Sequence, residues 1–296
     1  MLKNKVIKTI YSYYLLPVLI FSLGGTYAFS ANYDAESRHN AFVGELHSSS
    51  TQDGMCKVME TFYHPDNIRL SVANEHYNYI VDLIYSVSSN YTKTVKNNKY
   101  RNLEELDKFR VFCSNRKSQL FSRKWIKNFV KANRIASQDG ELTTLEGALP
   151  HRDNLRIFYL WRKSGHNWYF YYASTNKMLF KKINEGTKQN IIKIMSAHYR
   201  IDYMFDRCLG FKNQIFNSDH ISLLLQQVYG TNLKQFIVVN KKDIEAARKL
   251  ERQKVDHAVK MPNSCDSEKA RDQVVIALLN AVGRNIKTVS MSATRN

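Results

Sequence analysis

The sequence reads LRIFYLWRK at residues 155–163, SGHN at 164–167 and WYFYYA at 168–173. Alternating aromatic, β-branched and basic residues on both sides of a Gly-containing turn are typical of an antiparallel hairpin. Thr175, Asn176 and Lys177 indicate another turn, after which Met178 to Ile183 are predicted as a third strand. The sequence therefore predicts a small antiparallel β-meander at about residues 155–183.

Helical periodicity surrounds this meander on both sides. Apolar residues recur at intervals of three and four before residue 134, and helices are again expected at about 186–208, 218–229, 241–260 and 267–283. The predicted fold is helix-dominated α+β, with the meander between two helical sections. The short apolar run Phe236–Val239 is interpreted as a possible further strand.

The chain is divided at its changes of pattern. We expect a signal peptide, a polar N-terminal tether, a helical section, a loop or linker, and the meander with the C-terminal helices. Whether the first helical section forms one domain with the last part stays open. The corresponding ranges are 1–30, 31–54, 55–133, 134–154 and 155–296.

The first thirty residues have the plan of a secretory signal peptide. Lys3, Lys5 and Lys8 precede a short apolar run, and small residues follow it. The alternative is a retained membrane anchor, because residues 11–31 are just long enough to span a bilayer. Export to the periplasm or the outside is predicted, with no transmembrane domain after cleavage.

Four cysteines fit an oxidising compartment. An even number in an exported chain indicates two disulfides. The chain contains no CxxC motif, so a zinc ribbon is not indicated. Three connectivities are possible. Pairing of nearest neighbours is favoured, which would join Cys56 to Cys113 and Cys208 to Cys265.

The charge favours acidic partners. The 296-residue chain carries 44 Lys and Arg against 26 Asp and Glu, a formal net charge of +18. Such a surplus attracts anionic polymers, membrane surfaces or acidic envelope proteins. Enrichment of lysine by an AT-rich coding sequence is the alternative explanation, and the charge leaves both open.

One possible catalytic group lies on a predicted helix. His198 and Asp202 are four residues apart, so a hydrogen bond between them would orient the imidazole as a general base. His76, on the apolar face of another helix, is a candidate third member. The structural alternative is that these histidines are satisfied core residues.

A second candidate site combines aromatic rings with cations. Aromatic faces beside guanidinium or ammonium groups suit stacking on bases or sugars. The alternative is an aromatic core with a basic rim, since one face of the meander must cover the helices. The hairpin candidates are Arg156, Trp161, Arg162, Lys163, Trp168 and Tyr169, and a basic helical surface adds Lys124 and Lys127.

These observations favour an exported, basic, disulfide-stabilised protein that binds an anionic, envelope or extracellular partner without catalysis. A secreted hydrolase using His198 and Asp202, and a structural subunit of an envelope assembly, are the two alternatives. No cofactor and no metal are expected. No motif indicates a known family, and the oligomeric state stays open.

Overall fold

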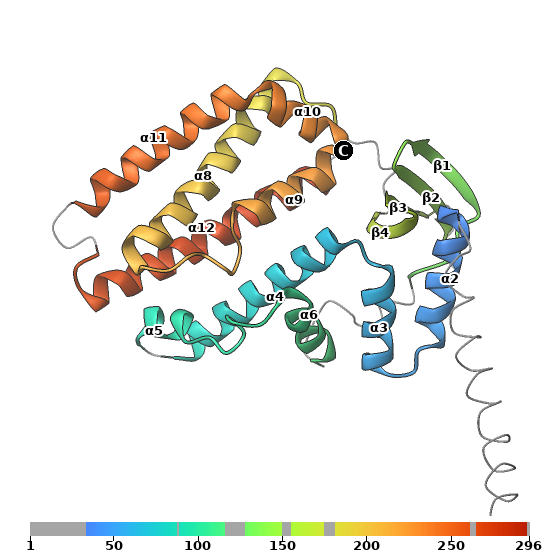
Figure 1. The fold of residues 1–296 in the computed structure, drawn as a ribbon, viewed down its shortest axis with the longest axis horizontal. Helices are drawn as coiled ribbons and strands as arrows, with labels where there is room; N and C mark the ends of the chain where they lie inside the picture. The colour runs from blue at the N-terminus through green and yellow to red at the C-terminus, as the bar shows by residue number, and fades with distance from the viewer. Residues whose placement is uncertain are drawn as a thin grey trace, which may run out of the picture.

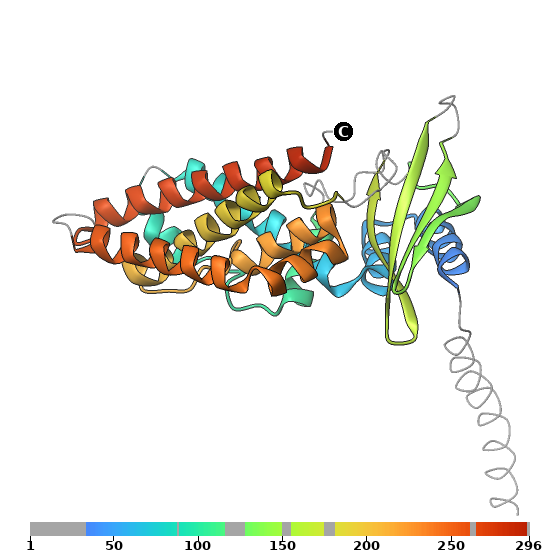
Figure 2. The ribbon, with the colours of Figure 1, turned by 90° about the horizontal axis from the view of Figure 1, so that it is seen from above.

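The computed structural model describes residues 34–87, 89–115, 128–149, 155–174, 181–260 and 265–294. The predicted signal peptide and the candidate residues Lys124 and Lys127 lie outside these residues. A four-stranded sheet with short helices lies at one end of the molecule, and long helices fill the other end (Figures 1 and 2). The predicted helix-dominated α+β fold, with a sheet between two helical regions, is confirmed.

The end with the sheet is called the sheet lobe. Its helices are α2 (Ala35–Ser48), α3 (Gln52–Phe62) and α6 (Glu105–Ser114). Its strands are β1 (Arg134–Asp139), β2 (Leu142–Ala148), β3 (Arg156–Ser164) and β4 (Asn167–Ser174), in that order and all antiparallel. Gly140 and Gly165 adopt positive φ in the two hairpin turns, a conformation in which glycine carries no steric cost.

The other end is called the helical lobe. It contains α5 (Tyr91–Lys96), α8 (Glu185–Leu209), α9 (Ser218–Tyr229), α10 (Thr231–Val239), α11 (Lys241–Val259) and α12 (Glu268–Thr294). Helix α8 begins at an N-cap, Asn184, which accepts from the Thr187 N–H, and ends at Gly210 with positive φ. Asn217 and His220 form a capping box at the start of α9.

Helix α4 (Pro65–Ser86) connects the two lobes. It starts at Pro65, whose fixed φ suits the first helical position. Ile68 and Val72 belong to the hydrophobic core of the sheet lobe. Ile80 and Ile84, farther along the same helix, belong to the core of the helical lobe. The chain therefore has two cores that share one helix.

Each lobe carries its own disulfide. Cys56 of α3 is bonded to Cys113 of α6, and Cys208 of α8 is bonded to Cys265, just before α12. The predicted nearest-neighbour connectivity is confirmed. Each bond closes a long loop of the chain, and a crosslink of this kind contributes about 2–4 kcal/mol to folding stability.

Two segments predicted as irregular are regular. Residues 31–54, expected to be a polar tether, contain α2, because Phe42 and Leu46 share one apolar stripe with Ala35 that packs into the sheet lobe. Residues 134–154, expected to be a loop or linker, contain β1 and β2. Their polar composition reflects an exposed edge strand, and pairing with β3 places Leu145 in the core.

The limits of the sheet also differ from the prediction. The sheet covers residues 134–174 instead of about 155–183, and the expected third strand finds no support at 181–183, which are not in a strand. The rest of that expected strand lies outside the described residues. The run Phe236–Val239 belongs to α10 and is not a strand, because Phe236 and Leu233 face the core one turn apart.

One helix among the described residues has the length and composition needed to cross a membrane. It is Glu268–Met291 within α12, with a mean hydropathy of 1.2 in its most apolar window. A core helix passes the same test, and α12 supplies Val275, Leu279 and Val282 to the core of the helical lobe. The absence of a transmembrane domain after the leader stays a prediction.

Replacing Phe42 by Ala tests whether α2 is an integral part of the fold. Phe42 is completely buried and contacts five aromatic side chains, so the variant should lose about 3–5 kcal/mol of unfolding free energy. Denaturant unfolding of the purified chain measures this loss. The matched control is Glu45→Ala, which changes an exposed residue of the same helix. Equal stability of both variants would show that α2 is a dispensable tether.

Candidate functional site

The predicted pair of His198 and Asp202 does not form. His198 is completely buried, and its Nδ1 accepts a hydrogen bond from Asn285 at 2.8 Å. Asp202 instead accepts from the backbone N–H of Ser218 at 2.8 Å and from the side chain of Asn213 at 3.1 Å. The carboxylate therefore holds the turn before α9, and the imidazole is not oriented by it.

His76 belongs to the same buried interior. Its Nε2 accepts from the Asn98 amide, and its ring lies 6.0 Å from that of Phe112. Burial lowers the pKa of His76 and of His198 to about 4, and the charge of Lys108 lowers the pKa of His76 further. Both rings are neutral near pH 7 and out of reach of solvent. Within the described residues, no group of three or more His, Cys, Asp or Glu is arranged to hold a metal ion.

The two tryptophans of the hairpin are core residues. Trp161 is completely buried, and its Nε1 donates to Nδ1 of His39 at 3.3 Å. Trp168 is 8% exposed. The stacking surface predicted from these rings is therefore not available, because their faces are covered by the core of the sheet lobe. Tyr169 is half-buried beside His64, at 6.1 Å between ring centroids.

The hairpin cations have different surroundings. Arg156 and Arg134 both pair with Glu146, which is 2% exposed, at 3.3 Å and 2.6 Å. Arg162 pairs with Asp66 at 3.5 Å. Lys163 is exposed. The structure thus uses the two hairpin arginines as ion-pair partners, and it does not gather the hairpin candidates on one exposed face.

A cavity of about 600 Å³ lies between α8, α9 and α12. Its volume is within the range of sites for small molecules. Ile191, Leu225 and Val289, all nearly completely buried, form its apolar wall. Its remaining described lining residues are Lys181, Lys182, Thr187, Asn190, Lys193, Ile194, Ala197, Val228, Tyr229, Asn285 and Thr288.

The polar side of this lysine cavity is basic. Lys181, Lys182 and Lys193 are the charged residues among the described lining, and no carboxylate is among them. Lys182 and Lys193 are exposed. A sequence signal was present, because Lys193 interrupts the apolar run from Ile191 to Met195. The walls formed by α9 and α12 come from residues about 35 and 95 positions after Lys193 in the chain, so no local sequence pattern indicates the cavity.

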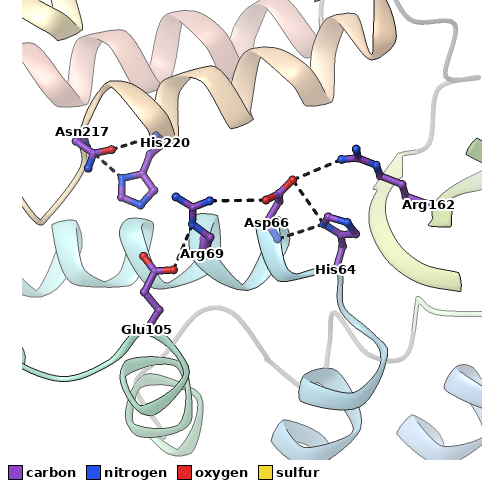
Figure 3. A network of polar contacts seen from close by, with 7 residues as sticks. All are labelled: His64, Asp66, Arg69, Glu105, Arg162, Asn217 and His220. Atoms are coloured by element: carbon purple, nitrogen blue, oxygen red, sulfur yellow. Dashed lines mark hydrogen bonds and ion pairs between the residues drawn. The ribbon is translucent and has the colours of Figure 1, made fainter. Parts of the chain in front are cut away.

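A polar network lies where the two lobes meet (Figure 3). Asp66, in the first turn of α4, contacts Arg162 of β3 and also Arg69, at 3.5 and 3.8 Å. His64 contacts Asp66 at 3.6 Å, and burial is the main cause of its lowered pKa. The picture labels His64, Asp66, Arg69, Glu105, Arg162, Asn217 and His220. Asp66 therefore links the connecting helix to the sheet.

The architecture defines the class of the protein: a helix-dominated α+β chain with two hydrophobic cores, one disulfide in each, and a basic cavity in the helical lobe. No protein-family model matches the chain, and comparisons with curated proteins and with solved structures give no match. The chemistry of its sites is therefore the basis for proposing a function.

Acidification should destabilise the protein below about pH 6.5. Burial lowers the pKa of four histidines to about 4. As the pH falls from about 6.5 to 4, these histidines therefore become protonated in the unfolded chain before they do so in the folded chain, which favours unfolding. Asp202 opposes this, because burial raises its pKa to about 6 and the folded state is then protonated first. Because one carboxyl opposes four imidazoles, the folded state has a net loss of stability as the pH falls. The four are His39, His76, His198 and His220.

The variant His198→Leu should reduce this loss by up to about 3 kcal/mol, since it removes one buried group that resists protonation. Denaturant unfolding at a series of pH values measures the slope. The control His166→Gln alters an exposed turn residue and should keep the slope of the original chain. A slope that is equal in all three proteins would contradict the assignment of His198.

Proposed function

We propose that this protein is a non-enzymatic binding protein for an anionic ligand, and that the lysine cavity is the binding site. The observation that supports this proposal is a cavity of about 600 Å³ whose charged lining residues, among those described, are all lysines. The net charge of +18 adds a long-range attraction for the same kind of ligand. Export of the chain is part of the proposal, and the two intramolecular disulfides are compatible with it.

The wall of the cavity indicates more than charge. Ile191, Leu225 and Val289 present aliphatic surface below the lysine rim, and Val228 and Tyr229 extend it. A ligand with an anionic head and an aliphatic chain would bury the chain here and leave its head among the ammonium groups. Asn190 and Thr187 supply uncharged polar groups at the same side. We therefore infer a carboxylate or phosphate amphiphile.

The alternative functions have less support. The hydrolase depended on a hydrogen bond between His198 and Asp202, and each of these residues bonds to other partners. A structural role in an envelope assembly stays a prediction. It would need a large exposed apolar patch. The most exposed apolar side chains among the described residues are Tyr85 on α4 and the neighbours Val238 and Val239 at the end of α10.

Calorimetric titration with decanoate tests the proposal. The double variant Lys182→Gln/Lys193→Gln should bind decanoate about tenfold more weakly, because each lost ammonium group removes a charge-assisted contact with the carboxylate. Raising the salt concentration should weaken binding to the original chain, because salt screens exposed charges. Decanol, which has the chain without the charge, should bind more weakly than decanoate.

The matched control is Lys242→Gln/Lys249→Gln. It removes the same charge from exposed positions of α11 that do not line the cavity, and it should bind decanoate as the original chain does. Equal weakening by both double variants would indicate a general effect of net charge and contradict the site. Absence of decanoate binding, or an affinity that is independent of salt, would overturn the proposal.

A further inference from the structure

Helix α10 presents an apolar pair to solvent. Leu233 and Phe236 face the core of the helical lobe. Val238 and Val239, at the end of the same helix, are 75% and 74% exposed. These are the largest exposed fractions among the valine, leucine, isoleucine and methionine side chains that the structure describes. Two adjacent exposed valines on an otherwise well-packed helix indicate a surface that contacts something outside the protein.

Lysines lie on both sides of this pair along the chain. Lys234 precedes Val238 by four residues of helix, a spacing that places the two side chains on one side with Cβ atoms about 5–6 Å apart. Lys241 and Lys242 follow at the start of α11. Because consecutive Cα atoms are about 3.8 Å apart, both lie within about 11 Å of the Cα of Val239.

The protein does not neutralise this positive charge. Residues 230–242 contain three lysines and no Asp or Glu. The next acids along the chain, Asp243 and Glu245, each pair with a lysine, at 3.3 and 3.9 Å. Lys234 and Lys242 are exposed, and neither has an ion pair among the described residues. The apolar pair is therefore bordered by cations that an external anion can neutralise.

A shallow groove of about 460 Å³ runs beside the apolar pair. Phe236 and Val239 of α10 line it together with Lys182 and Ile183, which lie just before α8. Figure 1 shows the start of α8 next to the corner between α10 and α11. Its other described lining residues are uncharged and polar, so no carboxylate lines it. We define the α10 surface as this groove with Lys182, Lys234, Val238, Val239, Lys241 and Lys242.

The composition of the α10 surface favours a lipid bilayer over a protein as its partner. Protein interfaces are enriched in aromatic residues, methionine and arginine and depleted in lysine. Lysines beside exposed aliphatic side chains are typical of segments that lie on anionic membranes, where the ammonium groups meet lipid phosphates. A second copy of this chain is disfavoured, because it would bring two sets of lysines together.

We propose that the α10 surface docks this protein onto an anionic lipid bilayer. Val238 and Val239 enter the interfacial layer of the bilayer, and the lysines around them donate to lipid phosphates. Lys182 lines both the groove and the lysine cavity, so docking brings that cavity beside the bilayer. The bilayer is then the source of the anionic amphiphile. This last step rests on the proposed function, whereas the docking does not.

Sedimentation of the full chain with vesicles tests the docking. The protein should bind vesicles of equal parts phosphatidylcholine and phosphatidylglycerol, and vesicles of phosphatidylcholine alone at least about tenfold more weakly. Lys234→Gln/Lys242→Gln should weaken binding to the anionic vesicles about tenfold or more, since each lysine near such a surface contributes about fivefold. The matched control Lys249→Gln/Lys260→Gln removes the same charge from exposed positions farther along the chain and should bind nearly as the original does.

A second pair of variants tests the apolar contact. Val238→Gln/Val239→Gln keeps the charge and should weaken binding to the anionic vesicles about tenfold, because the transfer of two side chains out of water is lost. Both side chains are about three-quarters exposed, so the variant should keep the stability of the original chain. The control Leu250→Gln changes an exposed apolar residue of α11 and should bind normally.

A tryptophan at position 238 locates the contact. Trp161 and Trp168, the tryptophans among the described residues, are buried, so the emission added by Val238→Trp reports the surroundings of the new side chain. Anionic vesicles that contain brominated phosphatidylcholine should quench this added emission. They should not quench the emission added by Leu250→Trp. A contact made by another part of the chain, including residues 1–30, would leave both unquenched.

The docking is overturned if the added emission of Val238→Trp is not quenched, or if both lysine double variants weaken binding equally. Binding to soluble polyglutamate without binding to vesicles would assign the surface to an acidic protein and overturn the proposal. Self-association that Val238→Gln/Val239→Gln abolishes, again without vesicle binding, would assign it to a second copy with the same consequence.

The titration with decanoate judges the lysine cavity separately. Lys234 and Lys242 do not line that cavity, so Lys234→Gln/Lys242→Gln should bind decanoate as the original chain does. Decanoate binding without vesicle binding therefore overturns the docking alone, and vesicle binding without decanoate binding overturns the proposed function alone.

Discussion

The shared helix α4 is the constraint on which the rest of the structure depends. Its first half packs Ile68 and Val72 into the sheet lobe, and its second half packs Ile80 and Ile84 into the helical lobe. A rigid helix that is buried at both ends fixes the distance between the two cores. Asp66 then fixes the orientation of the sheet, because it joins the first turn of α4 to Arg162.

The parts of the fold that the sequence predicted are those with strong local patterns. Helices α8 and α9 have long apolar periodicities and clear caps, and the β3–β4 hairpin has an aromatic pattern around Gly165. Helix α2 was missed because polar residues separate its few core contacts. Strand β1 was missed because it is an exposed edge whose pairing depends on β2. In both cases tertiary contacts decide the structure, and the local sequence carries little of that information.

The same division applies to the sites. Residue type and local spacing placed His198, Asp202 and Trp161 among the candidates, but reactive or aromatic groups are equally useful in a core. The lysine cavity needs residues from α8, α9 and α12. No spacing along the chain records that these segments meet. The local sequence signal of the lysine cavity is Lys193, a cation inside an apolar run.

The distribution of cations connects the architecture with the proposed ligand binding. In the sheet lobe, arginine supplies ion pairs: Arg134 and Arg156 hold the buried Glu146, and Arg162 holds Asp66. The planar guanidinium suits such fixed pairs, whereas the lysine ammonium is a mobile, hydrated charge. Lysines are the cations that line the lysine cavity, and Lys234 has no ion pair among the described residues at the junction. A surplus of lysine produced by coding bias alone does not account for a cavity whose described lining holds three lysines and no carboxylate.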